Sequence, residues 1–343
     1  MKNSMKRNIL IALFAVVSLA GWAQEKSKVN PGWLWEISGN GLAQKSYLFG
    51  TCHGEGHNFT NEEIYGSIYG LADAVNQAET LFLEVSDNQK LKAELNKEDM
   101  EKFKEMMDKL KNPGPESMMP EGVYYKPFFD SLSHFNEFHS FMTYKMKDPE
   151  YWKKNPSYWS MRLSLYLFTM PRKNVRTVDG AMREEFLKRG KEVGGLESSA
   201  FGFSKVLSKY MNTSSLDTMS MKNQVNLVYA FSKICNNDSL FQGNTSYKNY
   251  LVNDTCYFSR CLQEGQNEMK KKIGDQTYKA LEESREYENQ HLLKERNEAW
   301  IPIIRENIAQ RPCLIAVGCK HLMGDIGLIA MLRRKGYTVT PVF

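Results

Sequence analysis

The C-terminal stretch predicts a strand, a loop, a helix and a second strand, an order that few folds accommodate. Residues 313–317 form a short apolar run that stops at Gly318, and His321 follows three residues later. Residues 326–332 have helical spacing, and residues 337–342 have the pattern of a second strand. In open α/β sheets the loop after a strand is where ligands bind. The stretch therefore predicts an α/β fold with His321 at a ligand-binding edge.

A second G-x-x-H unit lies near the other end of the chain. Residues 46–53 form an apolar run, then Gly50, two further residues and His53. Because most of the chain separates the two units, only the fold can bring them together. A single histidine at a strand end is more often structural, but two in the same setting indicate a shared site.

The first 23 residues have the three parts of a cleavable secretory signal. Three basic residues precede an apolar segment over residues 9–19, and residues 21–23 end in small side chains. The apolar segment is short for a bilayer span, and no cysteine follows it to carry a lipid. We therefore expect a signal peptide over residues 1–23 and a periplasmic or secreted protein with no stable membrane anchor after cleavage.

The rest of the chain, residues 24–343, is expected to form one α/β domain with large helical additions. A helical insertion is predicted over about residues 88–170 and a further helical segment over about residues 199–308. Aromatic and methionine residues in the insertion either pack a core of their own or shape a substrate groove. Without the leader the net charge falls from +5 to about +2, which gives no indication of a nucleic-acid partner.

Strand and helix patterns alternate along this domain. Residues 60–63 form a capping box that predicts a helix to about residue 76, and Asp179 is expected to cap a helix from Gly180. Residues 270–308 predict a long charged helix or helix pair. Further strands are predicted at residues 33–38, 45–51, 80–86, 174–178 and 192–197, the first two joined by a tight turn at residues 39–41.

Two of these strands end in an acid. Glu84 is expected in a strand buried on both faces, where its carboxylate needs a partner because an unpaired buried charge is costly. The alternative for Glu84 is a solvent-facing position at the edge of the sheet. Glu197 likewise ends a short apolar run.

Two histidines and two acids thus lie at predicted strand ends, namely His53, Glu84, Glu197 and His321. These are the ligand types that hold zinc, manganese or cobalt while leaving room for water. Such an ion lowers the pKa of the water and polarises a carbonyl, and a glutamate can accept the proton. The local cluster of His53, Glu55 and His57 is a competing metal site, weakened by its glycine-rich loop.

Six cysteines permit disulfides in an exported protein, although their spacing does not fix the pairing. Cys52 and Cys319 each lie inside a G-x-x-H unit, so their thiols are expected to be close if the two loops meet. A catalytic thiol is a further alternative, less favoured because the adjacent histidines have better-supported roles.

Several motifs, in their order along the chain, resemble the TraB/PrgY/GumN family, which includes the Tiki metalloproteases. They are residues 47–53 (YLFGTCH), 83–84 (LE), 178–179 (VD), 195–197 (GLE), 295–297 (ERN) with Trp300, 317–324 (VGCKHLMG) and 336–339 (GYTV). The resemblance implies an erythromycin-esterase/ChaN-like fold, a mixed β-sheet flanked by helices, with the active site between the two G-x-x-H loops. It also implies catalytic roles for His53, Glu84, Glu197 and His321, with Arg296 and Asn297 in support.

The chain departs from the family pattern in three places. Residues 198–203 (SSAFGF) lack the glutamine that follows the GLE motif, and a cysteine lies inside both G-x-x-H units. The insertion over residues 88–170 matches no family feature. Because that insertion is expected to shape the groove, the resemblance says least about specificity.

Tiki-like members are metal-dependent peptidases, and other members are known through inhibition of a conjugation pheromone. We therefore expect an exported metal-dependent hydrolase, peptidase- or amidase-like, that acts on a peptide or a small amide or ester with manganese, cobalt or zinc. Two alternatives stay open: a non-catalytic protein that binds or sequesters a peptide or pheromone, and a metal-free esterase-like hydrolase with a histidine as general base. For Arg296 the alternative is a solvated helix face beside Glu295 and Glu298.

Overall fold

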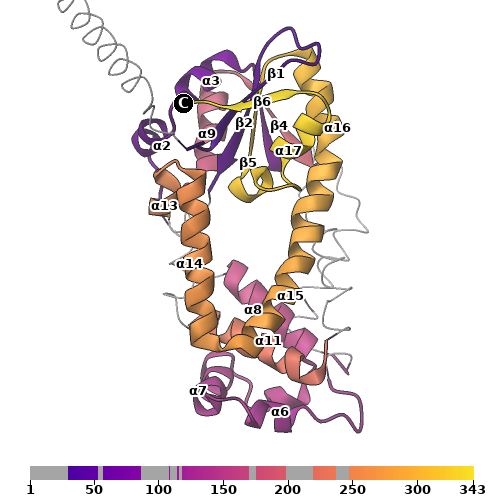
Figure 1. The fold of residues 1–343 in the computed structure, drawn as a ribbon. Helices are drawn as coiled ribbons and strands as arrows, with labels where there is room; N and C mark the ends of the chain where they lie inside the picture. The colour runs from indigo at the N-terminus through magenta and orange to yellow at the C-terminus, as the bar shows by residue number, and fades with distance from the viewer. Residues whose placement is uncertain are drawn as a thin grey trace, which may run out of the picture.

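A computed structural model describes residues 30–52, 57–85, 118–169, 175–197, 219–236 and 247–343, together with residues 108, 114 and 115. A β-sheet covered by helices lies at one end of the molecule and a group of helices at the other (Figure 1). Helices α14 (Thr255–Ile273) and α15 (Asp275–Glu288) run between these two parts. Among the described helices, none is long and apolar enough to cross a membrane.

The sheet has six strands in the order β4-β3-β5-β2-β1-β6. Strands β4, β3, β5 and β2 run parallel to one another, whereas β1 is antiparallel to both β2 and β6. The predicted α/β fold with a mixed sheet and flanking helices is confirmed. The strands are β1 (Leu34–Ser38), β2 (Ser46–Thr51), β3 (Thr80–Val85), β4 (Glu192–Glu197), β5 (Cys313–Gly318) and β6 (Thr338–Pro341).

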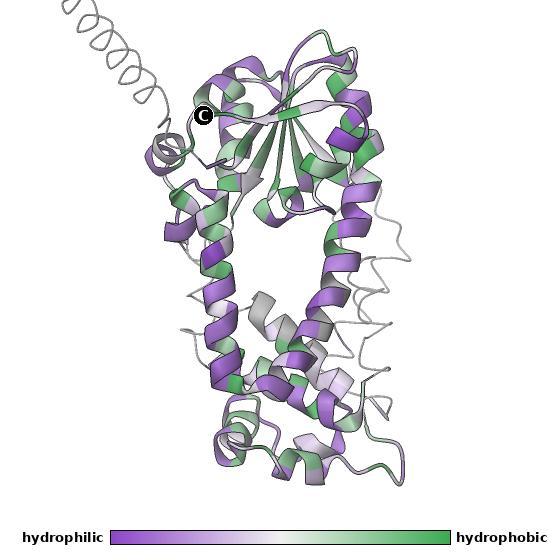
Figure 2. Cartoon of the chain, viewed as in Figure 1, coloured by the Kyte–Doolittle hydropathy of each residue, from purple (hydrophilic) through white to green (hydrophobic). Residues whose placement is uncertain are grey.

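Both faces of the sheet are covered, which explains why its central strands are almost wholly apolar. In β5, Leu314 and Ala316 face one core cluster, while Ile315 and Val317 face the other. Apolar residues accordingly concentrate in the strands (Figure 2). The first cluster lies under α2 (Asn61–Ser67), α3 (Leu71–Gln77), α9 (Val178–Lys188) and α13 (Tyr247–Leu251), and the second under α16 (Glu295–Gln310) and α17 (Leu328–Arg334).

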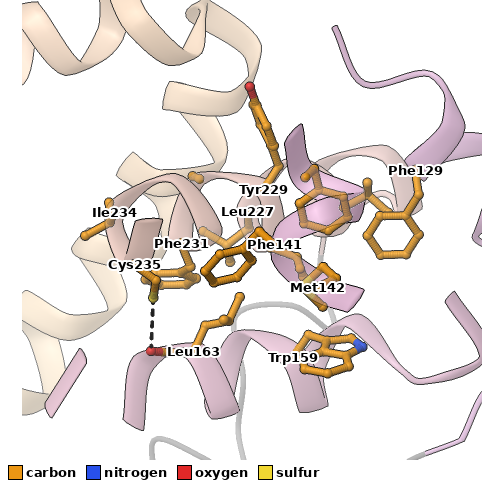
Figure 3. Close-up of a cluster of buried hydrophobic side chains, with 14 of the residues drawn as sticks. Phe129, Phe141, Met142, Trp159, Leu163, Leu227, Tyr229, Phe231, Ile234 and Cys235 are labelled. Carbon is orange, nitrogen blue, oxygen red and sulfur yellow. Dashed lines mark hydrogen bonds between the residues drawn. The ribbon is translucent and has the colours of Figure 1, made fainter. Parts of the chain in front are cut away.

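The helices at the far end pack around an aromatic core of their own. Phe129, Phe141 and Trp159 lie in this core, and the thiol of Cys235 donates to the carbonyl of Leu163 at 3.7 Å (Figure 3). The core joins parts of the chain that are distant in sequence. Its helices are α6 (Lys126–Asp130), α7 (Phe135–Ser140), α8 (Pro156–Thr169) and α11 (Met221–Asn236), with the end of α14 and part of α15.

The hairpin and the capping box form as predicted. Strands β1 and β2 pair across a turn in which Gly39, Asn40 and Gly41 all have positive φ angles, of 73°, 49° and 81°. Thr60 and Glu63 form the reciprocal capping box of α2. The prediction of a single helix to residue 76 is wrong, because a short non-helical segment separates α2 from α3.

Two further predictions are wrong in their details. Residues 175–177 are not a strand, because this segment exchanges hydrogen bonds with the loop at Asn58 and Phe59 instead of with the sheet. Thr177, not Asp179, caps α9, since its hydroxyl accepts from the Gly180 N–H at 3.1 Å.

The charged stretch over residues 270–308 is interrupted twice. Gly274, with φ of 79°, separates α14 from α15, and the π-helix η6 (Asn289–Lys294) separates α15 from α16. The predicted signal peptide lies outside the described residues, as do residues 88–107 of the predicted insertion.

Candidate functional site

The two G-x-x-H units lie on neighbouring strands. Strand β2 pairs in parallel with β5, with Gly50 opposite Val317 and Thr51 opposite Gly318. Because parallel strands end at one edge of the sheet, the loops that follow them begin side by side. His53 itself lies outside the described residues.

The two predicted acids lie at the same edge. Strand β3 is flanked by β5 and β4, so Glu84 belongs to an interior strand, and Val85 lies opposite Glu197 in the register of β3 with β4. The sheet therefore brings Glu84, Glu197 and the loop of His321 to one place. The alternative of a position at the edge of the sheet is therefore wrong for Glu84.

Arg296 joins these residues. Its Nε donates to Oε1 of Glu197 at 2.6 Å and its Nη2 donates to Oε2 of Glu84 at 2.8 Å. Its Nη1 lies 3.3 Å from Nε2 of His321. Arg296 is buried in the first turn of α16, so the solvated-face alternative is wrong. Both carboxylates thus share one guanidinium, whose fork suits paired carboxylate contacts.

Asn297, the next residue, fixes the orientation of His321. Its amide Nδ2 donates to the carbonyls of His321 and Ile326, at 3.2 and 2.8 Å. Oδ1 must therefore be the atom that faces Nδ1 of His321, at 2.7 Å, and it accepts the proton that Nδ1 carries. Nε2 of the neutral ring keeps its lone pair and accepts a hydrogen bond from Nη1 of Arg296, at 3.3 Å.

Burial keeps His321 uncharged. It lowers the pKa of His321 to about 4, with Glu84 acting to raise this pKa and Arg296 to lower it further. At neutral pH the imidazole is therefore neutral and its Nε2 can accept a proton. Its ring is nearly inaccessible, since only 5% of the side chain is exposed.

The two glutamates have pKa values that shift in opposite directions. Burial acts to raise the pKa of Glu84, but His321, Arg296 and the Gly318 N–H hold it below its ordinary value. Since His321 is uncharged at neutral pH, Arg296 and Gly318, whose N–H donates to Oε1 of Glu84 at 2.7 Å, are the groups that keep Glu84 ionised. Burial raises the pKa of Glu197, and Arg296 only partly offsets this.

Trp300 completes the site, although its role was not inferred from the sequence. It lies 4.6 Å from the ring of His321 and 4.7 Å from the guanidinium of Arg296, measured to ring centroids. Its indole N–H interacts with the carboxyl of Glu197 and acts to lower the pKa of that carboxyl. A position one helical turn after Arg296 was the available signal, because residues four apart share a helix face.

The site opens to solvent at Glu84. The side chain of Glu84 is 24% exposed, whereas those of Arg296 and Glu197 are 6% and 9% exposed. A substrate would therefore first meet the carboxylate of Glu84.

The predicted metal site stays a prediction, because the described residues include only three of its four ligands. Across the described ranges, no three His, Cys, Asp or Glu side chains are arranged to hold a metal. The guanidinium of Arg296 takes up one oxygen of each carboxylate, and the Gly318 N–H takes the second oxygen of Glu84. His53, the fourth predicted ligand, lies outside the described residues.

The sequence also suggested two competing sites, the cluster that includes His57 and a catalytic cysteine. Nε2 of His57 lies 3.0 Å from Oε1 of Glu63, and its ring stacks on Tyr247 at 3.7 Å between centroids. The other members of that cluster, His53 and Glu55, lie outside the described residues. Burial raises the pKa of Cys319 to about 12, which disfavours the thiolate that a catalytic cysteine needs.

Comparison with known proteins gives one match. A model of the TraB/PrgY/gumN family matches residues 33–341, nearly the whole chain. No curated protein and no solved structure matches it.

Proposed function

The chain belongs to the TraB/PrgY/gumN family, and from that premise we propose that it is a hydrolase of peptide, amide or ester bonds in which His321 activates water. One observation carries the proposal. Asn297 holds the proton of His321 on Nδ1, at 2.7 Å, so that Nε2 is the proton-accepting nitrogen, and it lies 3.7 Å from Oε1 of Glu84. A histidine whose other nitrogen is fixed by a hydrogen bond is the usual general base of hydrolases.

Glu84 stabilises the proton once His321 has taken it from water. Oε1 of Glu84 lies 3.7 Å from Nε2 of His321, so the imidazolium forms next to an ionised carboxylate. This attraction offsets part of the burial penalty that makes the resting imidazole a weak base. Removal of Glu84 should therefore slow the step that generates the nucleophile.

Glu197 is the proton donor to the leaving group in this proposal. The pKa of Glu197 is raised whereas that of Glu84 is lowered, so Glu197 is the carboxyl that more readily holds a proton. Two carboxyls with pKa values shifted apart commonly divide acid and base roles. Arg296 bridges the two glutamates and holds them at fixed positions.

The steps above use only described side chains, and the metal site predicted with His53 stays a prediction. The substrate proposed is a peptide or a small amide or ester, and the proposed location is the periplasm or the exterior of the cell, where the leader-like N-terminus would direct the chain.

Hydrolysis of peptide, amide and ester libraries by the full chain tests this function. Cleavage by the wild type and by His134→Ala, which alters an exposed histidine of the helical part, but not by His321→Ala, would support it. Tight peptide binding without cleavage would overturn it in favour of a binding protein. Activity lost with a chelator and regained with manganese or cobalt would overturn the role of His321 as general base and restore the metal site predicted from the sequence.

A further inference from the structure

Two cysteines directly follow the neighbouring strands that lead into the G-x-x-H units. Thr51 lies opposite Gly318 at the ends of the parallel strands β2 and β5, and Cys52 and Cys319 are the residues that come next. Neighbouring strands lie about 4.8 Å apart. That spacing is within the range of Cα separations that disulfides span, about 4.4–6.8 Å.

The backbones approach closely at this point. A Cβ added to Gly50 would lie 3.2 Å from both Cα and Cβ of Cys319, so the loop after β5 packs directly on the end of β2. The absence of a side chain at Gly50 is what permits this contact.

Both cysteine side chains lie on the same side of the sheet. Cys319 is a buried member of the core cluster under α9 and α13, and Cys52 packs against that cluster. Tyr250, whose hydroxyl donates to the carbonyl of Gly50 at 2.8 Å, interacts electrostatically with both thiols. Cys52 also raises the pKa of the Cys319 thiol, second only to burial, so each sulfur lies within reach of the other's charge.

We propose that Cys52 and Cys319, which are thiols in this structure, are a redox pair that closes into a disulfide joining the two G-x-x-H loops. The inference does not depend on hydrolysis. The other described cysteines belong to different elements: Cys235 to α11, Cys256 and Cys261 to α14, and Cys313 to the opposite end of β5.

The difference in exposure between the two residues suggests the order of the reaction. Cys52 is half-buried whereas Cys319 is buried, so an external disulfide meets Cys52 first. The Cys52 thiolate attacks a sulfur of a small disulfide or of a thiol oxidoreductase, and one thiol leaves. The Cys319 thiol, whose proton is lost as its sulfur bonds to Cys52, then displaces the second external thiol. Two protein thiols are thereby oxidised, and one external disulfide is reduced to two thiols with the two protons.

Peptide mapping under non-reducing conditions tests the pair. The full chain is treated with oxidised glutathione, alkylated, digested and analysed by mass spectrometry. We expect one cross-linked peptide that contains Cys52 and Cys319, both in the wild type and in the double variant Cys256→Ser/Cys261→Ser, and its loss on reduction. Alkylation of both Cys52 and Cys319 after oxidation, or a link from either to a different cysteine, would overturn the proposal.

A stability measurement gives a second readout. Because the disulfide would close a loop that includes most of the chain, oxidation should raise the unfolding temperature of the wild type by about 5 °C. The same treatment should leave Cys319→Ala unchanged. If that variant does not fold, the non-reducing peptide map of the wild type still shows whether Cys52 and Cys319 are linked. A wild type whose unfolding temperature does not rise although the link has formed would contradict the stabilising role.

Discussion

Oδ1 of Asn297 accepts the Nδ1 proton of His321 at 2.7 Å, while the amide nitrogen of the same asparagine donates to two backbone carbonyls. The two carbonyl contacts allow only one orientation of the amide, and that orientation allows only one tautomer of the imidazole. A neutral side chain that is fully buried thus determines the chemistry of a residue 24 positions away in the sequence. The first prediction concerns this contact.

Asn297→Ala should lower kcat by about 10–100-fold with little change in KM, because His321 is then free to place its proton on Nε2. Asn307→Ala is the matched control, since the amide of Asn307 donates only to Ile303 within the same helix. Steady-state kinetics as a function of pH checks the effect. Equal losses in both variants would show that the asparagine acts only on folding.

Stability should depend on pH through His321. Its folded-state pKa of about 4 lies below the ordinary value of 6.5, so between these pH values the unfolded chain binds a proton that the folded chain does not. Stability is therefore complete above about pH 6.5 and declines as the pH falls toward 4, by roughly 3 kcal/mol in total. Urea unfolding at pH 7 and pH 5 should show a smaller decline for His321→Asn, and an identical decline would contradict the assignment.

Arg296→Ala should destabilise the fold by about 3–5 kcal/mol, because it leaves the carboxylates of Glu84 and Glu197 without their shared counter-ion. Arg311→Ala is the control on the same chain segment. Arg311 pairs with Glu192 at 2.6 Å, but both side chains are substantially exposed, so its loss should cost less than about 1 kcal/mol. Chemical denaturation of the two variants provides the comparison, and similar costs would argue against a buried network.

Gly318→Ala should impair activity without unfolding the protein. An added Cβ would lie 3.1 Å from Oε1 of Glu84, which accepts the N–H of the same glycine, and would move that carboxylate. A displacement of this kind costs on the order of 100-fold in rate. Gly66→Ala in helix α2, where an added Cβ meets nothing within 4 Å, should leave activity intact and stabilise by up to about 1 kcal/mol. Kinetics of both variants separate the two effects.

Local patterns in the sequence predicted the sheet well, because a short apolar run that ends at a glycine or an acid is compatible with few structures other than a buried strand. The parallel pairing of β2 with β5 follows from two units of identical design at opposite ends of the chain. The strand predicted at residues 174–178 was wrong because its backbone hydrogen bonds go to a distant loop, a partner that local periodicity does not reveal.

The composition of the site was easier to predict than its chemistry. Five of the six predicted residues lie together in the described part, but no local pattern indicates that Arg296 bridges the two glutamates. Ligand types alone favour a metal, and only the observed contacts show a guanidinium in that position. The role of Trp300 was missed because a buried tryptophan in an amphipathic helix is ordinarily a core residue.

The π-helix η6, just before the site, rotates α16 about the helix axis relative to α15. It ends at Lys294, two residues before Arg296. Each residue of an α-helix turns the chain by about 100°, and a π-turn contains one residue more than an α-turn. Deletion of one residue within η6 would therefore leave α15 and α16 as intact helices, yet it would swing the guanidinium about a quarter turn relative to the helical part. The rotation of α16 relative to α15 is thus set by a six-residue segment that lies outside both of them.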